Sequence, residues 1–319
     1  KLKVGALLCG DRARPGRGRG GGRMTRLVLR LSPPLGAAAA LGLSSGFVAS
    51  LYLWRLAGYE DKDRNETGTI KRRFASTLLA CICSAGLVRS LAIPSPAGLT
   101  MAELLGLAPV EPLRSCASCL GLTAALFLGP LLQSLVAVWE GAGQPTGFQR
   151  GLWMVLRDLV VAPFTEEFVF RACVVRLLAA ASFPGIAISL ASPLCFALAH
   201  VHHFREHVRR LEDKQAAMMQ VAFQLFYTSL FGMYSTYLLM RTGSTFAVTL
   251  AHTFCNHMGF PDIGFLVSDR HALHRHRVWL GVSYMLGMLL FCCLLVPLTA
   301  HFHSHFAGSR EGDRVLYYE

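Results

Sequence analysis

Charged side chains are scarce in this sequence. Asp, Glu, Lys and Arg together make up 16% of its 319 residues, whereas the hydrophobic residues, with Tyr and Cys counted among them, make up 53%. A soluble globular domain usually carries about 25% charged residues and about 45–50% apolar ones. The shortage of charge therefore argues against a soluble domain and favours a protein with several membrane helices.

Acidic residues are scarcer than basic residues. The 19 Asp and Glu residues stand against 31 Lys and Arg residues, which gives a formal net charge of +12 at pH 7. The basic residues gather in the N-terminal tail, at residues 71–73, and in polar breaks at residues 201–214 and 269–277. Basic loops of this kind flank membrane helices and contact anionic lipids. Because the sequence contains no recognisable RNA- or DNA-binding module, we expect membrane lipid and no nucleic acid as a partner.

Paired metal-binding motifs and internal repeats are also lacking. Cys116 and Cys119 form a single CxxC with no second pair, which is too little for a zinc site of that type. The HExxH spacing of many zinc proteases is absent. The sequence has no internal repeat, whereas a transporter is often built from inverted repeats.

Long apolar segments are abundant. A helix that crosses a membrane needs about 20 mostly apolar residues. The candidate segments are residues 36–56, 74–94, 117–139, 151–181, 184–200, 217–240, 243–260 and 278–299. They predict an all-α fold, a polytopic integral membrane helix bundle of about seven to eight transmembrane helices that encloses an intramembrane cavity.

Polar tails flank the predicted membrane domain, which covers residues 31–300. Residues 1–30 are rich in Gly and Arg, so we expect a disordered basic tail, with Met24 as the expected true start of the protein. Residues 301–319 form a polar C-terminal tail.

Two adjacent carboxylates interrupt one apolar segment, in the stretch FTEEFVFR at residues 164–171. A carboxylate within a membrane segment costs ~2.5–3.5 kcal/mol on insertion scales. Arg171 follows Glu167 by four residues, so the spacing predicts an ion pair on one helical face. Glu166 has no local cation, and Pro163 predicts a kink at the edge of a cavity. These features favour Glu166 as a general base; a cluster that only holds helices together is the alternative.

Two histidines lie in two further apolar segments. FALAH places Phe196 and His200 four residues apart, and AHTFCNH places His252 and Asn256 at the same spacing. Each pair therefore lies on one face of its helix. Because polar groups are costly against lipid, we expect three helices to direct Glu166, His200 and His252 toward a common centre. Taken singly, each histidine has the alternative of an ordinary buried core residue.

The three motifs occur in a fixed order on successive apolar segments. EEFVFR, FALAH and HTFCN resemble the motifs EExxxR, FxxxH and HxxxN of the CAAX-protease and bacteriocin-processing family. More closely, the flanking sequences APFTEEFVFRAC, HVHH and HTFCNHMGFP resemble the CAAX prenyl endopeptidases of the Ras-converting enzyme type. The resemblance covers about residues 30–300, is strongest over residues 150–262, and includes every motif position.

The resemblance implies an activity, substrates and a location. The activity would be that of an intramembrane endopeptidase, which removes the aaX tripeptide from farnesylated or geranylgeranylated CaaX proteins such as Ras-type small GTPases. It implies a glutamate-dependent enzyme without a cofactor, in the endoplasmic reticulum membrane. We expect its active site to be accessible from the cytoplasmic side.

The resemblance also implies a role for each motif residue. Glu166 and His200 would hold and activate the attacking water, whereas His252 and Asn256 would stabilise the oxyanion. The residues implied to support this geometry are Glu167, Arg171 and Phe196.

Three alternatives stay open at this point. Glu166, His200 and His252 could together ligate zinc, as two imidazoles and a carboxylate do in metalloproteases. A thiol protease could use Cys173 or Cys255, although neither has a histidine at a recognisable spacing. A non-catalytic membrane scaffold or transporter-like protein is the third alternative.

Overall fold

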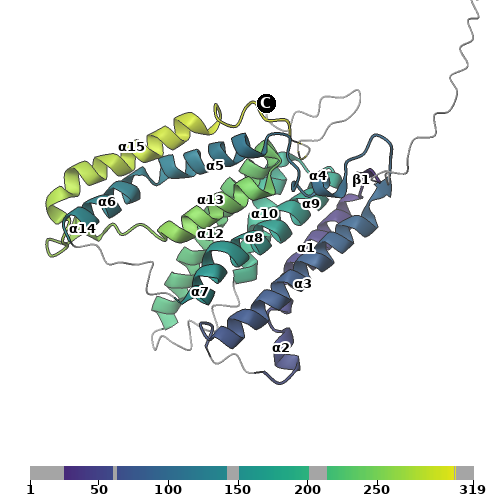
Figure 1. Cartoon of the computed structure of the whole chain (residues 1–319), viewed down its shortest axis with the longest axis horizontal. Coiled ribbons are helices and arrows are strands. Elements are labelled where there is room, and N and C mark those ends of the chain that lie inside the picture. Colours follow the sequence, from purple (N-terminus) through teal and green to yellow (C-terminus); the bar gives the residue numbers. More distant parts are fainter. Residues whose placement is uncertain (1–24, 60–62, 142–150, 201–213, 305, 307–319) are drawn as a thin grey trace, which may run out of the picture.

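The computed structural model describes residues 25–59, 63–141, 151–200, 214–304 and 306, without the side chains of residues 196–200, 214, 216 and 217. The described part is mostly helical, as the sequence predicts (Figure 1). A helix or a run of helices corresponds to each of the eight predicted apolar segments. The secondary structure of the predicted bundle is therefore confirmed.

The N-terminal part consists of helices closed by a two-stranded sheet. Its elements are β1 (Leu27–Val28), α1 (Pro33–Ser50), α2 (Leu53–Leu56), α3 (Thr67–Leu91) and β2 (Ile93–Pro94). The first turn of α1 contains Pro33 and Pro34, which fit there because the N–H groups of a first turn have no partner within the helix. α1 packs against α3 and against the central helical segment described below.

The two strands form a short ladder beside the helices. They pair in antiparallel register, with Leu27 opposite Pro94 and Val28 opposite Ile93. The N–H of Leu27 donates to the carbonyl of Leu99 at 2.7 Å, and the Leu27 side chain is buried. The fold is therefore mostly helical with one short ladder, and Arg26, Leu27 and Val28 take part in main-chain bonds.

A bent pair of helices packs against the last long helix. These elements are α5 (Pro112–Leu126), α6 (Leu128–Trp139) and α15 (Arg277–Leu295), preceded in the chain by the short α4 (Met101–Leu104). α5 and α6 meet at an angle of 68°, and α15 runs along both of them (Figure 1). Pro130 accounts for the bend because it has no N–H to donate to Leu126, four residues earlier. A Cβ atom at Gly129 would overlap the ring of Tyr284, so glycine allows α15 its close approach.

The EEFVFR motif lies in one helical segment whose pitch changes along its length. Its elements are α7 (Leu152–Leu156), η1 (Arg157–Val161), α8 (Ala162–Glu166), η2 (Glu167–Val175) and α9 (Arg176–Ala180). η1 and η2 are π-helical, which means that N–H groups reach carbonyls five residues earlier instead of four. The kink predicted at Pro163 takes the form of this change of pitch, since Pro163 lies near the start of α8, between the two π-helical stretches.

Five further elements complete the described part of the chain. They are α10 (Gly185–His200), α12 (Lys214–Thr242), α13 (Thr245–Met258), α14 (Gly264–Val267) and the 3-10 turn η3 (His274–His276). α12 and α13 are joined by a tight turn in which Gly243 has a φ of 65°, a conformation that favours glycine. Ser244 then caps α13 by accepting from the N–H of Ala247 at 3.2 Å. The turn brings α13 alongside α12.

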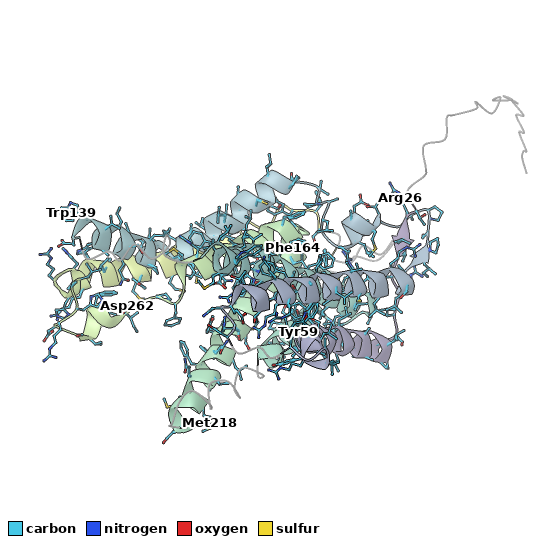
Figure 2. The ribbon with its side chains drawn as sticks, turned by 60° about the horizontal axis from the view of Figure 1, so that its bottom comes forward. Arg26, Tyr59, Trp139, Phe164, Met218 and Asp262 are labelled. Carbon is cyan, nitrogen blue, oxygen red and sulfur yellow. The ribbon has the colours of Figure 1, made fainter. Side chains whose placement is uncertain are left out.

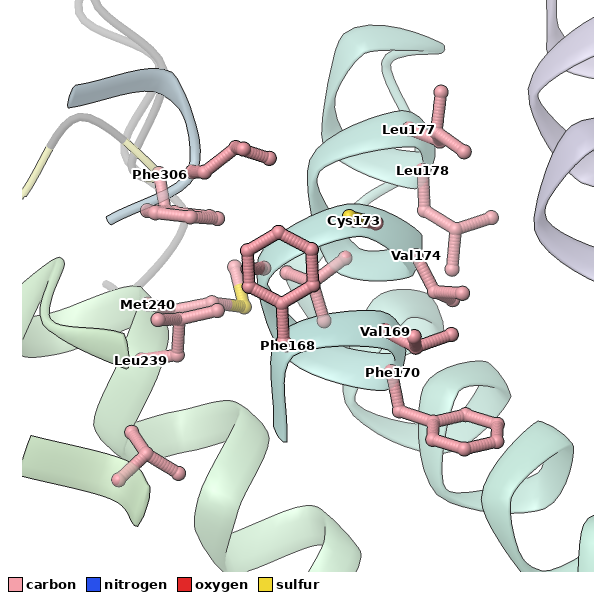
Figure 3. Close-up of a cluster of buried hydrophobic side chains, with 14 of the residues drawn as sticks. Phe168, Val169, Phe170, Cys173, Val174, Leu177, Leu178, Leu239, Met240 and Phe306 are labelled. Carbon is pink, nitrogen blue, oxygen red and sulfur yellow. The ribbon is translucent and has the colours of Figure 1, made fainter. Parts of the chain in front are cut away.

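The hydrophobic core surrounds η2. Every residue from Glu167 to Leu178 is buried, which is typical of a helix at the centre of a bundle. Figure 3 shows Phe168, Val174 and their neighbours on this segment, with Leu239 and Met240 of α12 close by. The carboxylates of the first motif are therefore placed in the middle of the molecule, on its most buried helix.

Part of the bundle has the length and composition of membrane spans. Two described helical segments, Thr67–Leu91 and His274–Leu295, are long and apolar enough to cross a membrane, and the bent pair α5–α6 would be a third span. The predicted number of seven to eight spans is larger than the number of described helices that meet this criterion. In Figure 2, Trp139 and Asp262 mark one end of the molecule, Arg26 the other, and Phe164 lies between them.

Candidate active site

Glu167, Arg171 and His252 form a buried chain of ionic contacts. Nε of Arg171 lies 3.2 Å from Oε2 of Glu167, and both side chains are fully buried. Nδ1 of His252 donates to Oε1 of the same carboxylate at 2.7 Å. The predicted ion pair between Glu167 and Arg171 is confirmed. The contact with His252 was missed from the sequence, and it ties α13 to η2.

Glu166 faces the other ring nitrogen of His252. Its Oε2 lies 3.9 Å from Nε2 of His252, which is longer than a hydrogen bond. The Glu166 side chain is 20% exposed, whereas that of Glu167 is 0% exposed. The predicted difference between the two adjacent glutamates is therefore present: Glu167 is held by two partners, and Glu166 is partly exposed beside the imidazole.

The cluster combines two carboxylates with one guanidinium and one imidazole. Glu166 and Glu167 contribute two negative charges, and Arg171 contributes one positive charge. Because a buried ion carries a desolvation penalty of several kcal/mol unless it is paired, the contacts among these groups offset part of that cost.

Aromatic packing from α12 holds the imidazole in place. The ring of Phe231 lies 4.7 Å from the ring of His252, measured between centroids, and Cζ of Arg171 lies 5.9 Å from the same aromatic centroid. A Cβ atom at Gly232 would lie 2.9 Å from Cβ of Pro193 and 3.2 Å from Nη2 of Arg171. Glycine at this position thus lets α12 lie close to both α10 and η2.

Two more side chains of α13 bond to main-chain carbonyls of η1. Oγ1 of Thr253 donates to the carbonyl of Leu159 at 2.8 Å, and Nδ2 of Asn256 donates to the carbonyl of Asp158 at 2.9 Å. Asn256 thereby reaches the same helical segment as His252, as its spacing predicts. The contact of Thr253 was not predicted from the sequence. Pro163 was the available signal, because a proline has no N–H to donate to the carbonyl of Leu159, four residues earlier.

The second motif is described only as backbone. His200 is the last residue of α10, and Phe196 lies one turn earlier on the same helix. Their side chains lie outside the described part of the chain, as do the histidines of the HVHH stretch that follows. α10 packs against α12 and η2, so the second motif lies on a helix that borders the first. The role expected for His200 stays a prediction.

No group of three His, Cys, Asp or Glu side chains that could hold a metal ion occurs among the described residues. The zinc alternative includes His200, whose side chain is outside that set, so the alternative is untested. The two thiols considered as nucleophiles differ in access: Cys173 is fully buried, and Cys255 is partly buried.

One family model matches the part of the chain that carries these motifs. The model described as "Type II CAAX prenyl endopeptidase Rce1-like" matches residues 148–258. That range contains Glu166, Glu167, Arg171, His200, His252 and Asn256. No solved structure matches the chain at a significant level.

Curated relatives extend the similarity over most of the chain. CAAX prenyl protease 2 of Homo sapiens is 36% identical over 276 residues, which cover 82% of this chain and 80% of the relative. A probable CAAX prenyl protease 2 of Schizosaccharomyces pombe is 30% identical and covers 77% and 87% of the two chains. The Arabidopsis thaliana protein of the same name is 39% identical over 146 residues, 46% of this chain and 44% of the relative. Identity at this level over this length shows that the chain belongs to the CAAX prenyl protease 2 family.

Proposed function

We propose that this chain removes the aaX tripeptide from prenylated CaaX proteins, by hydrolysis of the peptide bond after the prenylated cysteine. One observation carries the proposal. Within the range that the family model matches, a buried chain of Arg171, Glu167 and His252 lies beside the partly exposed Glu166. The family of CAAX prenyl proteases supplies the class of substrate.

Glu166 is the proposed general base. It is the less buried of the two carboxylates, and its Oε2 lies 3.9 Å from Nε2 of His252, which is too far for a hydrogen bond. Glu166 takes a proton from the attacking water while the water oxygen adds to the scissile carbonyl. The C–N bond then breaks as Glu166 returns that proton to the leaving amine of the tripeptide. His200, on the neighbouring α10, is the proposed second holder of the water.

His252 and Asn256 are the proposed donors to the oxyanion. Nδ1 of His252 is engaged by Glu167, which leaves Nε2 as the only ring nitrogen that can face the substrate. In this proposal Nε2 donates to the oxyanion when both ring nitrogens of His252 carry a proton. Asn256 uses Nδ2 to bond the carbonyl of Asp158, and the second N–H of that amide group is the one available to the substrate. Removal of one such donor typically lowers the rate about 10²–10³-fold.

The membrane delivers the substrate in this proposal. Each buried CH₂ of a lipid chain contributes about 0.8 kcal/mol to membrane binding, so a farnesyl or geranylgeranyl anchor keeps the CaaX end at the bilayer. We propose that the shorter and interrupted helices lie in the membrane with the longer ones, giving seven to eight spans around a cavity. The proposed location is the endoplasmic reticulum membrane, with access to the site from the cytoplasmic side.

The experiment follows tripeptide release from a farnesylated CaaX peptide by the chain in membranes. Wild type and Glu166→Gln are each assayed with and without a strong zinc chelator. We expect activity that disappears in the variant and survives the chelator. Activity that is lost with the chelator and restored by zinc would instead make Glu166, His200 and His252 metal ligands. A folded wild-type chain that cleaves nothing would favour the non-catalytic scaffold.

A further inference from the structure

Pro163 leaves a gap in the hydrogen bonding of the helix that carries the catalytic glutamate. A residue with an N–H at this position would donate to the carbonyl of Leu159 in an α-helix, or to that of Asp158 in a π-helix. Proline has no N–H, so it can make neither bond. A main-chain carbonyl away from water is costly without a partner. The gap lies one turn before Glu166.

α13 fills this gap with two side chains. The hydroxyl of Thr253 donates to the carbonyl of Leu159 at 2.8 Å, and the amide of Asn256 donates to that of Asp158 at 2.9 Å. These are the two carbonyls that a donor at position 163 would have reached. The bonds join residues 94 and 98 positions apart in the sequence, so they fix one helix against the other.

We infer that Thr253 is a positioning residue of the active site, which uses its hydroxyl to hold α13 in register with the interrupted helix. The inference rests on the proposed function, because the groups that it positions are the proposed base and the proposed oxyanion donor. Thr253 follows His252 directly, and Leu159 lies seven residues before Glu166. A shift at this bond therefore moves the imidazole relative to the carboxylate.

The hydroxyl of Thr253 also differs from that of an ordinary helical threonine. Thr249, one turn earlier on α13, donates at 2.9 Å to the carbonyl of Thr245 within its own helix. Thr253 instead bonds to a different helix, at the carbonyl of Leu159, to which Pro163 has no N–H to donate. Both threonines are partly buried, so Thr249 is a matched control for the loss of a hydroxyl.

The first experiment compares Thr253→Val, Thr253→Ser and Thr249→Val in the peptide-release assay, with kcat and KM measured separately. Valine keeps the shape of threonine and removes the donor, whereas serine keeps the donor. A displacement of about 1 Å can lower a rate by up to about 100-fold, so we expect Thr253→Val to lower kcat by roughly 10–100-fold with little change in KM. Thr253→Ser and Thr249→Val should stay within about twofold of wild type, because neither removes the bond between the helices.

The second experiment repeats Thr253→Val in a Pro163→Ala background. Alanine at position 163 supplies the missing N–H, which can satisfy the Leu159 carbonyl from within the helix. The loss of the Thr253 hydroxyl should then have a smaller effect on kcat than in the wild-type background. Contacting residues typically show such non-additive effects.

The outcomes separate this inference from the proposed function. A wild-type chain that releases no tripeptide would refute the proposed function. If the wild-type enzyme is active and Thr253→Val has the same kcat, the positioning role alone is refuted. The role is also refuted if Thr253→Ser lowers kcat as much as Thr253→Val does. It is refuted as well if Thr253→Val lowers kcat by the same factor in the Pro163→Ala background. Melting curves in detergent complete the test: equal melting temperatures for the two valine variants, with different kcat, support positioning over general destabilisation.

Discussion

Glu167→Gln and Glu166→Gln should separate stability from catalysis, although the two glutamates are adjacent. Glutamine has nearly the shape of glutamate but no charge. At position 167 the change leaves the fully buried Arg171 and the buried His252 without their shared carboxylate. Removal of one partner from a buried ion pair costs about 3–5 kcal/mol. At position 166 the side chain is partly exposed and makes no contact shorter than 3.9 Å to His252, so the cost should be below about 1 kcal/mol.

The assay is thermal unfolding of the purified chain in detergent, next to tripeptide release per folded molecule. A loss of 1 kcal/mol lowers the melting temperature by about 2–4 °C in domains of 150–250 residues, so Glu167→Gln should lower it by roughly 10 °C. Glu166→Gln should melt within about 3 °C of wild type and show no release of the tripeptide.

A partial rescue gives the control for this reasoning. Buried ion pairs can often be replaced together by apolar groups at little cost. Arg171→Met in the Glu167→Gln background should therefore recover part of the lost melting temperature without restoring activity. The reasoning is refuted if Glu167→Gln melts like wild type, or if both single variants lose the same stability.

Two further predictions concern parts of the chain away from this cluster. Gly129→Ala should lower the free energy of unfolding by about 1–3 kcal/mol, because the new Cβ would overlap Tyr284. Gly121→Ala should be neutral or slightly stabilising, because no atom lies near its Cβ. Melting curves of the two variants test this difference. The bond from the Gly264 N–H holds the pKa of Asp262 below its ordinary value of 3.8. A lowered pKa in the folded state stabilises the chain above the unfolded value and loses that effect as the pH falls through the folded value. Asp262→Asn should therefore lower the melting temperature at neutral pH, with a difference that shrinks below about pH 4; a difference independent of pH contradicts this assignment.

Local spacing was sufficient to predict one part of the site. The ion pair between Glu167 and Arg171 follows from a separation of four residues, and that pairing needs only neighbouring turns of one helix. The eight apolar segments were also sufficient to predict where helices occur. Both depend on information within a few turns of the chain.

Contacts between distant segments could not be predicted in the same way. The bond between Glu167 and His252 joins two residues 85 positions apart, and their relative rotation depends on π-helical stretches that intrinsic propensities do not encode. The strands β1 and β2 have two residues each, which is too short for an alternating pattern to emerge. The bend between α5 and α6 had a signal in the sequence, because Gly129 is followed by Pro130. This pair lies within residues 117–139, which were predicted as one span.

The separation of Glu167 from His252 has a consequence for biosynthesis. A ribosome adds about 5–20 residues per second, so roughly 4–17 s pass between synthesis of the helix with the carboxylates and synthesis of the histidine 85 positions later. During that time Arg171 is the only cation of the cluster beside two carboxylates, and Glu167 lacks its second partner. The nascent chain therefore passes through a stage in which the charge cluster is incomplete. Its excess negative charge persists until α13 arrives and completes the cluster.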